Sequence, residues 1–355
     1  MAIYLLFMVA PIIVYFIMGL FSNKSINENA KLKSRYLIVC GIIMTLMIGL
    51  RHPRVGSGDT MFYYTNWEMM SEISISRLFA LNLDLEMGYQ LFVWLFSQVF
   101  HNGQWLLLLS GAFFAISVCF FMKRNCKNVV LALLVFNCLG LFNFMVQGLR
   151  QAIAMCICLW AIEQCKKKKL FPFLLLVVLA CTFHASAAVF AIVYIISKLK
   201  LETKSILIFS ICTFICVQLL PYLFEIVNVL INDTYEIGTG AETGGVVAIL
   251  IYGVIIAFGL IFVDRRDVNY PLFIYMAVLG AAFMIMRNTV SEIIVRIAHY
   301  FAFSQMVVLP NSIGSIADKR VQVFINIVVA ILCLGIAFYK ASYSILIPYT
   351  FFWQM

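Results

Sequence analysis

The stretch IYLLFMVAPIIVYFIMGLF, residues 3–21, contains no charged residue and is long enough to cross a lipid bilayer as one helix. No basic segment precedes it, so we expect a retained span rather than a cleaved signal peptide. Apolar runs of similar length recur along the 355 residues, of which 64% are hydrophobic and 12% charged. Because the bilayer core admits only helices and closed barrels, runs of this kind predict an all-α polytopic membrane protein.

The whole chain, residues 1–355, is expected to form a single membrane domain without an appended soluble domain. About 10–13 transmembrane or re-entrant helices are expected from the lengths of the apolar runs. The predicted spans lie near residues 3–21, 36–50, 104–122, 128–146, 149–165, 205–231, 246–263, 270–286, 294–314 and 321–340. The eleven cysteines fall in spans or near their cytoplasmic ends, so we expect free thiols and no disulfide framework.

The basic residues are divided between the two ends of these spans. Six clusters hold eighteen of the 25 Lys and Arg residues, and the positive-inside rule assigns these clusters to the cytoplasm. The other seven fall where the chain is expected outside: Arg51, Arg54, Arg77, Arg150, Arg287, Arg296 and Lys340. Six of the seven are arginines. Because a planar guanidinium binds phosphate or carboxylate through paired hydrogen bonds, this distribution favours recognition of an anion on the outer side.

Some segments are not predicted to cross the membrane as a single helix. Residues 51–87 form the longest polar stretch and are predicted to be an extracytoplasmic loop with short helices. Residues 170–197 are apolar but have basic clusters on both flanks, which predicts a broken helical hairpin that turns near residues 182–186; a single tilted span is the alternative. Residues 232–245 are acidic and glycine-rich and predict a flexible outer loop, either an ordinary solvated connection, which is favoured, or a mobile flap. Residues 88–100 and 104–122 are two apolar pieces that together make one crossing, so the shorter piece, 88–100, is expected to be re-entrant or interfacial.

The segment RHPRVGSGDT, residues 51–60, is the most informative for function. Arg51 and Arg54 leave the end of a span, and proline and glycine then force a turn that leads to Asp59. This order favours a phosphate clamp beside an acid or base, followed by Tyr63 and Tyr64 as aromatic surface for a sugar. The alternative is structural, with snorkelling arginines and Asp59 as a helix N-cap.

Other polar residues occur next to apolar helices on the same side. Glu86 is a candidate base or a partner for an arginine, although a carboxylate in a first helical turn also suits the helix dipole. Arg150 and Gln151 begin a span, where an arginine is expected to meet an anion, a wet cavity or an outer carboxylate. His184 lies at the predicted hairpin turn and is either a base or a hydrogen-bonded packing residue. Arg296 shares one helical face with Glu292, His299 and Tyr300, so an intrahelical Glu292–Arg296 pair is the alternative to ligand binding.

Several familiar signatures do not occur in the sequence. There is no phosphate-binding P-loop, no dinucleotide-binding glycine motif and no metal-ligand spacing of Cys and His. We therefore expect neither a metal nor a cofactor. The net charge of +9 reflects the orientation of the spans and forms no basic stripe on a soluble face, so nucleic-acid binding is not expected.

Taken in order, several motifs together resemble the EpsG-like family of bacterial polysaccharide polymerases. The motifs are RHPRVGSGDTMFYY (51–64), EMGYQLF (86–92), QGLRQAIA (147–154), CTFHASAAVF (181–190), RIAHYFAF (296–303) and VVLP (307–310). Residues from about 201 to 290 match only in hydrophobic character. The resemblance implies a Wzy-type enzyme of capsule, O-antigen or exopolysaccharide assembly, with an architecture similar to GT-C glycosyltransferases.

Such an enzyme is multi-pass in the bacterial cytoplasmic (inner) membrane, with its active site facing the extracytoplasmic side. It transfers a growing undecaprenyl-diphosphate-linked glycan onto the terminal sugar hydroxyl of a new lipid-linked repeat unit. A chain-length regulator protein and membrane lipids are its expected partners. On this hypothesis the catalytic candidates are Asp59, Glu86 and His184; the diphosphate ligands are Arg51, Arg54, Arg150 and Arg296; and the sugar-orienting residues are Tyr63, Tyr64, Tyr89, Gln151 and Tyr300.

Three other classes remain open from the sequence. A flippase or transporter of lipid-linked oligosaccharide would be expected to carry charges near the midplane or at both gates, whereas the arginines here gather on one side. A membrane acyltransferase would need an acyl donor reached through cytoplasmic loops, which here are short and lysine-rich. An O-antigen-ligase-like transferase shares most of the polymerase chemistry, and product analysis distinguishes the two.

Overall fold

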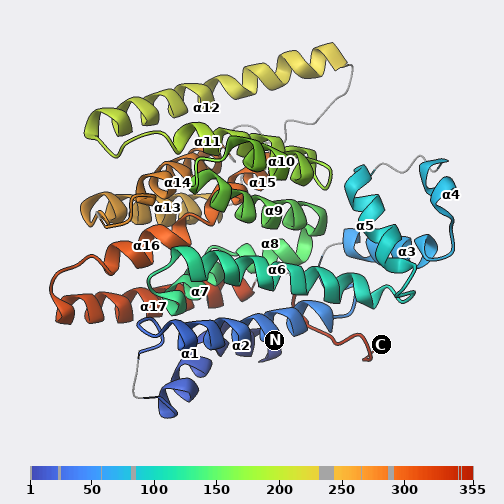
Figure 1. Cartoon of the computed structure of the whole chain (residues 1–355), viewed down its shortest axis with the longest axis horizontal. Coiled ribbons are helices and arrows are strands. Elements are labelled where there is room, and N and C mark those ends of the chain that lie inside the picture. Colours follow the sequence, from blue (N-terminus) through green and yellow to red (C-terminus); the bar gives the residue numbers. More distant parts are fainter. Residues whose placement is uncertain are drawn as a thin grey trace.

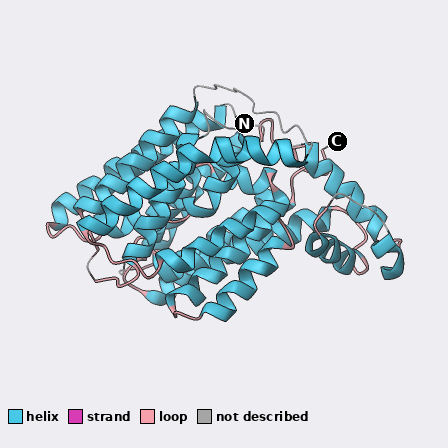
Figure 2. Cartoon of the chain, turned by 90° about the horizontal axis from the view of Figure 1, so that it is seen from above, coloured by secondary structure: helices cyan, strands magenta, loops and turns pink. Residues whose placement is uncertain are grey.

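The structure is a computed structural model that describes residues 2–22, 25–56, 58–80, 85–231, 244–264, 266–286, 292–342, 344 and 346–354. Residues 232–243 of the predicted outer loop, together with Asp84 and Arg287, lie outside the described residues. Within the described ranges the chain consists of helices and loops (Figure 2), apart from one isolated backbone bridge between Arg51 and Phe351. The chain is therefore an all-α protein.

The helices run nearly parallel to one another in an elongated bundle, with a small lobe at one end formed by α3, α4 and α5 (Figure 1). Their bounds are α1 Ala2–Leu20, α2 Ala30–Gly49, α3 Gly58–Met70, α4 Ile75–Ala80, α5 Met87–Ser97, α6 Gln104–Asn125, α7 Val129–Cys138, α8 Leu141–Gln147, α9 Leu149–Lys166, α10 Leu170–Cys181, the 3-10 helix η1 Ala185–Ala191, α11 Ile192–Ile196, α12 Thr203–Ile231, α13 Gly244–Ile261, α14 Tyr270–Ile285, α15 Glu292–Ala302, α16 Gln305–Ile313 and α17 Lys319–Ser342.

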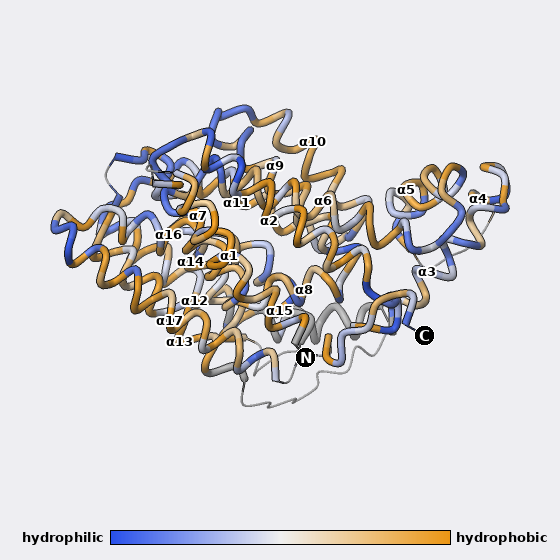
Figure 3. The backbone as a smooth tube through the Cα atoms, turned by 90° about the horizontal axis from the view of Figure 1, so that it is seen from below, coloured by the Kyte–Doolittle hydropathy of each residue, from blue (hydrophilic) through white to orange (hydrophobic). Residues whose placement is uncertain are grey.

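Four of the described helices, α1, α2, α6 and α17, are long and apolar enough to cross a membrane, and the bent pair α7–α8 would make a fifth span. Shorter apolar helices of 10–17 residues, including α10 and α14, pack among them. Hydrophobic segments form the middle of the bundle and hydrophilic segments gather toward its ends (Figure 3). The chain is thus a multi-pass membrane protein.

Helices α2 and α6 pack closely because glycine occupies their contact points. A Cβ atom built on Gly49 would lie 2.5 Å from Cδ1 of Leu108, and one on Gly111 would lie 3.0 Å from Cβ of Ile48. Helix α2 also begins earlier than hydropathy predicts, at Ala30 rather than near residue 36. Its start is set by Asn29, whose side chain caps the first backbone N–H groups.

The predicted span over residues 128–146 is divided into two helices. Gly140 adopts a left-handed backbone conformation, with φ of 78°, and α7 and α8 meet there at 60°. The carbonyl of Cys138 at the end of α7 accepts a 2.9 Å hydrogen bond from Nζ of Lys340. The positive charge of Lys340 therefore caps a helix C-terminus, which explains a basic residue at this otherwise arginine-rich end.

The chain turns back on itself between α10 and η1. Helix α10 ends at Cys181 and η1 begins at Ala185, and the two helices pack against each other. The start of α5 meets this turn, because the backbone N–H of Gly88 donates a 2.8 Å hydrogen bond to the carbonyl of Thr182. Helix α5 has only 11 residues and spans about 16 Å, roughly half the thickness of a bilayer core.

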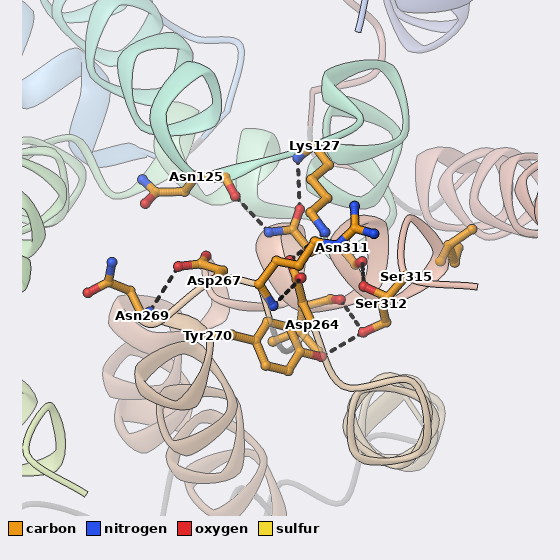
Figure 4. Close-up of polar contacts among 12 residues, drawn as sticks. Asn125, Lys127, Asp264, Asp267, Asn269, Tyr270, Asn311, Ser312 and Ser315 are labelled. Atoms are coloured by element: carbon orange, nitrogen blue, oxygen red, sulfur yellow. Dashed lines mark hydrogen bonds and ion pairs between the residues drawn. The ribbon is translucent and has the colours of Figure 1, made fainter. Parts of the chain in front are cut away.

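A polar cluster joins the α6–α7 connection to the loop before α14 and to α16 at the end of the bundle opposite the α3–α5 lobe (Figure 4). Nζ of Lys127 lies 2.7 Å from a carboxylate oxygen of Asp264, which is 1% exposed. The side chain of Asn311 accepts a hydrogen bond from the backbone of Lys127 and donates one to the carbonyl of Asn125. These contacts fasten several helices together at the lysine-rich end.

Candidate functional site

A cavity of about 260 Å³ lies where α3, α8, α9, the hairpin turn and α15 meet. Its lining is mostly polar and contains both signs of charge. The lining residues are Asp59, Tyr63, Phe144, Gln147, Gly148, Arg150, Gln151, His184, Val295, Arg296 and His299. Six of them are residues that the sequence predicts for the site, and they come from four separate parts of the chain.

Arg150 is held in place by two side chains. Its Nε donates a 2.8 Å hydrogen bond to the hydroxyl of Tyr63, and its Nη1 forms an ion pair with Glu86. The guanidinium also lies 5.5 Å from the centre of the Tyr63 ring. Both charged side chains are about one quarter exposed. Since these contacts use Nε and Nη1, the Nη2 group is left for a ligand in a guanidinium whose orientation is already fixed.

Arg296 contributes a second guanidinium to the same cavity. It lies on α15, is exposed, and forms no ion pair with any carboxylate in the described part of the chain. Its backbone carbonyl accepts a 2.7 Å hydrogen bond from the side chain of Gln151, which ties α15 to α9. The side chain of Glu292, the alternative partner from the sequence, lies outside what the structure describes.

Asp59 lies in the first turn of α3 and lines the cavity. Its side chain is exposed and makes no ion pair with a described basic residue. A carboxylate near a helix N-terminus is stabilised there by the helix dipole. Glu86, by contrast, is engaged with Arg150. Asp59 is therefore the carboxylate better placed to accept a proton from a ligand.

His184 lies in the hairpin turn and is connected to α15 through Ser186. The hydroxyl of Ser186 is 3.0 Å from Nδ1 of His184 and 3.1 Å from the hydroxyl of Tyr300. Nδ1 is also 4.0 Å from a carboxylate oxygen of Glu86. Burial lowers the pKa of His184 below its ordinary value; Glu86 opposes this shift, and the nearby charges of Arg150 and Arg296 add to it. The imidazole is consequently neutral at pH 7 and able to accept a proton.

Other predicted residues lie outside the cavity lining. Arg51 is 1% exposed, and its guanidinium donates hydrogen bonds to the backbone carbonyls of Val55 and Val146. Burial lowers its pKa to about 10, so it remains charged at neutral pH while holding the turn that precedes α3. Arg54 is exposed on that turn. Arg51 therefore has buried structural contacts, and Arg54 lies at the surface outside the cavity lining.

The predicted tyrosines differ in their positions. Tyr63 lines the cavity, and Tyr89 is buried behind it with ring centres 5.3 Å apart. Tyr300 is buried and reaches the site through Ser186. The hydroxyl of Tyr64 instead donates a 3.2 Å hydrogen bond to Asn102, away from the cavity.

Five lining residues were not chosen as site residues from the sequence: Phe144, Gln147, Gly148, Val295 and His299. The ring of His299 stacks on that of Phe144, with centres 4.1 Å apart and planes 12° from parallel. The helical spacing of His299 from Arg296 indicated a shared face, but its stacking partner comes from α8. Only the tertiary structure reveals that pairing.

The arrangement combines two guanidinium groups, a carboxylate and a neutral imidazole around a small space. The guanidiniums suit an anion such as a phosphate or diphosphate, and the carboxylate and imidazole suit the removal of a proton. Gln147, Gln151 and Tyr63 add hydrogen-bonding groups of the kind that orient hydroxyl-rich ligands. The site therefore has the groups needed for transfer from an anionic leaving group to a hydroxyl.

Comparison with known proteins identifies a family for this chain. No curated protein and no solved structure matches the chain, so the GT-C-like architecture stays a prediction. The EpsG family matches residues 34–351, a range that includes every residue lining the cavity. The chain thus belongs to the EpsG family, and this membership supports a role of the polysaccharide-polymerase type at the membrane.

Proposed function

We propose that this chain is a Wzy-type polysaccharide polymerase of the bacterial cytoplasmic membrane, with the cavity opening to the extracytoplasmic side. It transfers a growing glycan from undecaprenyl diphosphate to the terminal sugar hydroxyl of a new lipid-linked repeat unit. The observation that carries the proposal is the convergence of Arg150 and Arg296 with Asp59 and His184 in one cavity. The family match supports the polymerase class independently of that geometry.

The proposed reaction forms a bond between the acceptor oxygen and the anomeric carbon of the donor, and breaks the bond between that carbon and the diphosphate. Negative charge develops on the departing diphosphate. Arg150 and Arg296 stabilise this charge, and the fixed orientation of Arg150 lowers the reorganisation needed during the step. Each charge-assisted contact contributes about 1.5–3 kcal/mol.

The acceptor hydroxyl loses its proton as it attacks. Asp59 is the leading base because its carboxylate faces the cavity and is not engaged by a described cation. His184 is the second candidate, and Glu86 acts mainly by positioning Arg150 and His184. The cavity of about 260 Å³ has the volume of about nine water molecules. It accommodates the reacting groups, so the remainder of both glycans extends outside it.

The test uses single substitutions in a strain that lacks its own copy of the enzyme. We expect Arg150→Gln, Arg296→Gln and Asp59→Asn each to lower polymerisation by about 10- to 150-fold, the equivalent of one charge-assisted contact. Lipid-linked single repeat units then accumulate while protein levels stay normal. The measurement is polymer length by gel electrophoresis together with mass spectrometry of the lipid-linked intermediates.

Arg77→Gln is the matched control, because Arg77 is an exposed arginine on α4 that does not line the cavity. Long polymer from all three site variants would contradict the proposed site. Reconstitution in vesicles separates the polymerase from a flippase: translocation of lipid-linked sugar without chain extension would contradict the polymerase. Transfer of finished glycan to a different acceptor would instead indicate a ligase.

A further inference from the structure

A second cavity, of about 430 Å³, lies on the outside of the bundle along the seam between α2 and α6. Its floor is made of small or buried residues, among them Gly41, Ala112 and Ala115. Its walls are Ile38 and Ile42 from α2 and Ile116 from α6, all more than half exposed. We call this cavity the seam groove. Because both helices qualify as membrane spans, the seam groove faces the bilayer.

The polar groups of the seam groove are unevenly distributed. Lys123 and Ser34 line its lysine-rich end and Thr45 closes the other end, and the hydroxyls of Ser34 and Thr45 are bonded to the carbonyls of Ala30 and Gly41. Lys31 lies one helical turn before Ser34 on the same face of α2 and is exposed. Glu28, the acidic residue nearest along the chain, precedes the helix. An apolar channel with cationic groups at one end matches an amphiphile with an anionic head.

The length of the seam groove indicates which kind of lipid tail it fits. Ser34 and Thr45 are 11 residues apart on one helix, a distance of about 16 Å. A bilayer core is about 30 Å thick, so this length corresponds to one leaflet. An acyl chain of a phospholipid extends through one leaflet, whereas the long isoprenoid tail of a lipid-linked glycan would extend well beyond it.

The neighbouring cations also differ in availability. Nζ of Lys33 donates a 2.6 Å hydrogen bond to the carbonyl of Cys126, and the guanidinium of Arg124 lies 5.3 Å from the centre of the Phe120 ring. Lys123 is exposed and forms no ion pair with a carboxylate among the residues described. It is therefore the cation at the mouth of the seam groove that is best placed to meet a phosphate.

We propose that the seam groove is a binding site for one anionic phospholipid, with its phosphate at Lys123 and an acyl chain between α2 and α6. In the orientation given by the positive-inside rule this lipid belongs to the cytoplasmic leaflet. The site is remote from the cavity that contains Arg150 and does not depend on the reaction proposed for it.

The test measures lipid retained by the purified, delipidated full-length protein after addition of phosphatidylglycerol or phosphatidylcholine with identical acyl chains. Native mass spectrometry counts the bound molecules. We expect the wild type to retain one phosphatidylglycerol about fivefold more strongly than phosphatidylcholine, the difference that one lysine near a phosphate provides. Lys123→Gln should remove this preference, and Ala112→Leu, which fills the channel, should abolish retention of both lipids.

Two variants serve as matched controls. Lys319→Gln removes an exposed lysine from the start of α17, and Gly335→Leu adds the same side chain to a lipid-facing position with open space around it. Both should retain lipid as the wild type does. Equal retention of the two lipids by the wild type, or unchanged preference in Lys123→Gln, would overturn the proposal even if Ala112→Leu fails to fold. Displacement of phosphatidylglycerol from the seam groove by undecaprenyl phosphate would also overturn the proposal. So would a second copy of the chain that occupies the groove.

Discussion

Arg51 and Arg150 carry the same charge but have different surroundings. Arg51 is enclosed by backbone carbonyls, whereas Arg150 is held by Tyr63 and Glu86 at the edge of a cavity. A guanidinium bonded to carbonyls stabilises a turn; one bonded to a carboxylate and a phenol, with an N–H group remaining, is prepared for an anion. The partners rather than the residue type therefore distinguish the structural arginine from the proposed binding arginine.

Substitution of Arg51 is expected to lower stability. Arg51→Gln would leave the buried carbonyls of Val55 and Val146 with poorer donors, at about 1–3 kcal/mol for each unsatisfied group. We expect a melting temperature several degrees lower than that of the wild type in a thermal-unfolding measurement of the purified protein. The exposed Arg77, replaced in the same way, is the control. Identical melting temperatures for Arg51→Gln and wild type would show that the buried contacts are unimportant.

The lowered pKa of His184 predicts how activity depends on pH. Protonation of His184 would place a positive charge beside Glu86, where it competes with Arg150 for the carboxylate. It would also prevent His184 from accepting a proton. Since the pKa lies below its usual value of about 6.5, polymerisation by the reconstituted enzyme should persist at pH 6.5 and fall at lower pH. The unfolded chain binds the proton more readily, so the free energy of unfolding also falls as the pH drops through this window.

A pH profile of His184→Gln provides the check. The acid limb due to His184 should disappear or move, whereas Arg77→Gln should keep the wild-type profile. An unchanged acid limb in His184→Gln would assign that limb to another group.

The sequence predicts which residues are charged but not which of them meet. Arg51 and Arg54 are three residues apart and received the same prediction, yet one is buried and the other exposed. One contact of the buried Arg51 comes from Val146, almost a hundred residues away, whose carbonyl accepts a hydrogen bond from Arg51. A single sequence contains no signal for such a contact. Arg150, Arg296 and Asp59 line one cavity, and their positions relative to the spans already predicted that they lie at one end.

At the scale of helices, hydropathy predicts where a helix occurs better than it predicts whether that helix is continuous. Helices α9 and α14 lie close to their predicted bounds. The predicted span 294–314 is divided between α15 and α16 at residues 303–304, as 128–146 is divided at Gly140. Breaks of this kind depend on backbone conformation and on side-chain donors such as Lys340, to which an average over hydrophobicity is insensitive.

The contact between α5 and the hairpin turn gives a prediction at this scale. A Cβ atom on Gly88 would lie 2.2 Å from Oγ1 of Thr182 and 2.7 Å from its carbonyl oxygen. Gly88→Ala must therefore shift α5 away from the turn, which moves Glu86 relative to Arg150. We expect destabilisation of about 1–3 kcal/mol, typical of overpacking, and shorter polymer.

Gly253→Ala is the matched control, because Gly253 lies within α13 with nothing within 4 Å of its added Cβ. Alanine in a helix interior should stabilise that variant slightly. Normal stability and polymer length in Gly88→Ala would contradict the proposed coupling of α5 to the site.

The molecule as a whole has two chemically distinct ends. The lysine-rich end contains the network of Lys127, Asp264 and Asn311, and the other end contains the arginine cavity and the α3–α5 lobe (Figures 1 and 4). The distribution of basic residues along the sequence predicts the two ends. It does not predict that α3, α9 and α15 converge, because that depends on packing between segments far apart in the chain.

Cysteine labelling tests the orientation of these ends. In a cysteine-free background, Arg77→Cys should react with a membrane-impermeant maleimide in intact spheroplasts, and Lys319→Cys only after permeabilisation. Both positions are exposed in the structure, so accessibility depends on the membrane alone. Labelling in the reverse order would invert the topology and remove the extracytoplasmic polymerase proposed for the cavity.

The backbone contacts between residues near 50 and residues near 350 have a consequence for synthesis. His52 and Thr350 are hydrogen-bonded, as are Leu50 and Phe352, and Tyr349 reaches the carbonyl of Met47. The segment leading to Asp59 acquires these neighbours only after some three hundred further residues have been translated. A polypeptide released early by the ribosome would lack these contacts behind the turn that precedes α3.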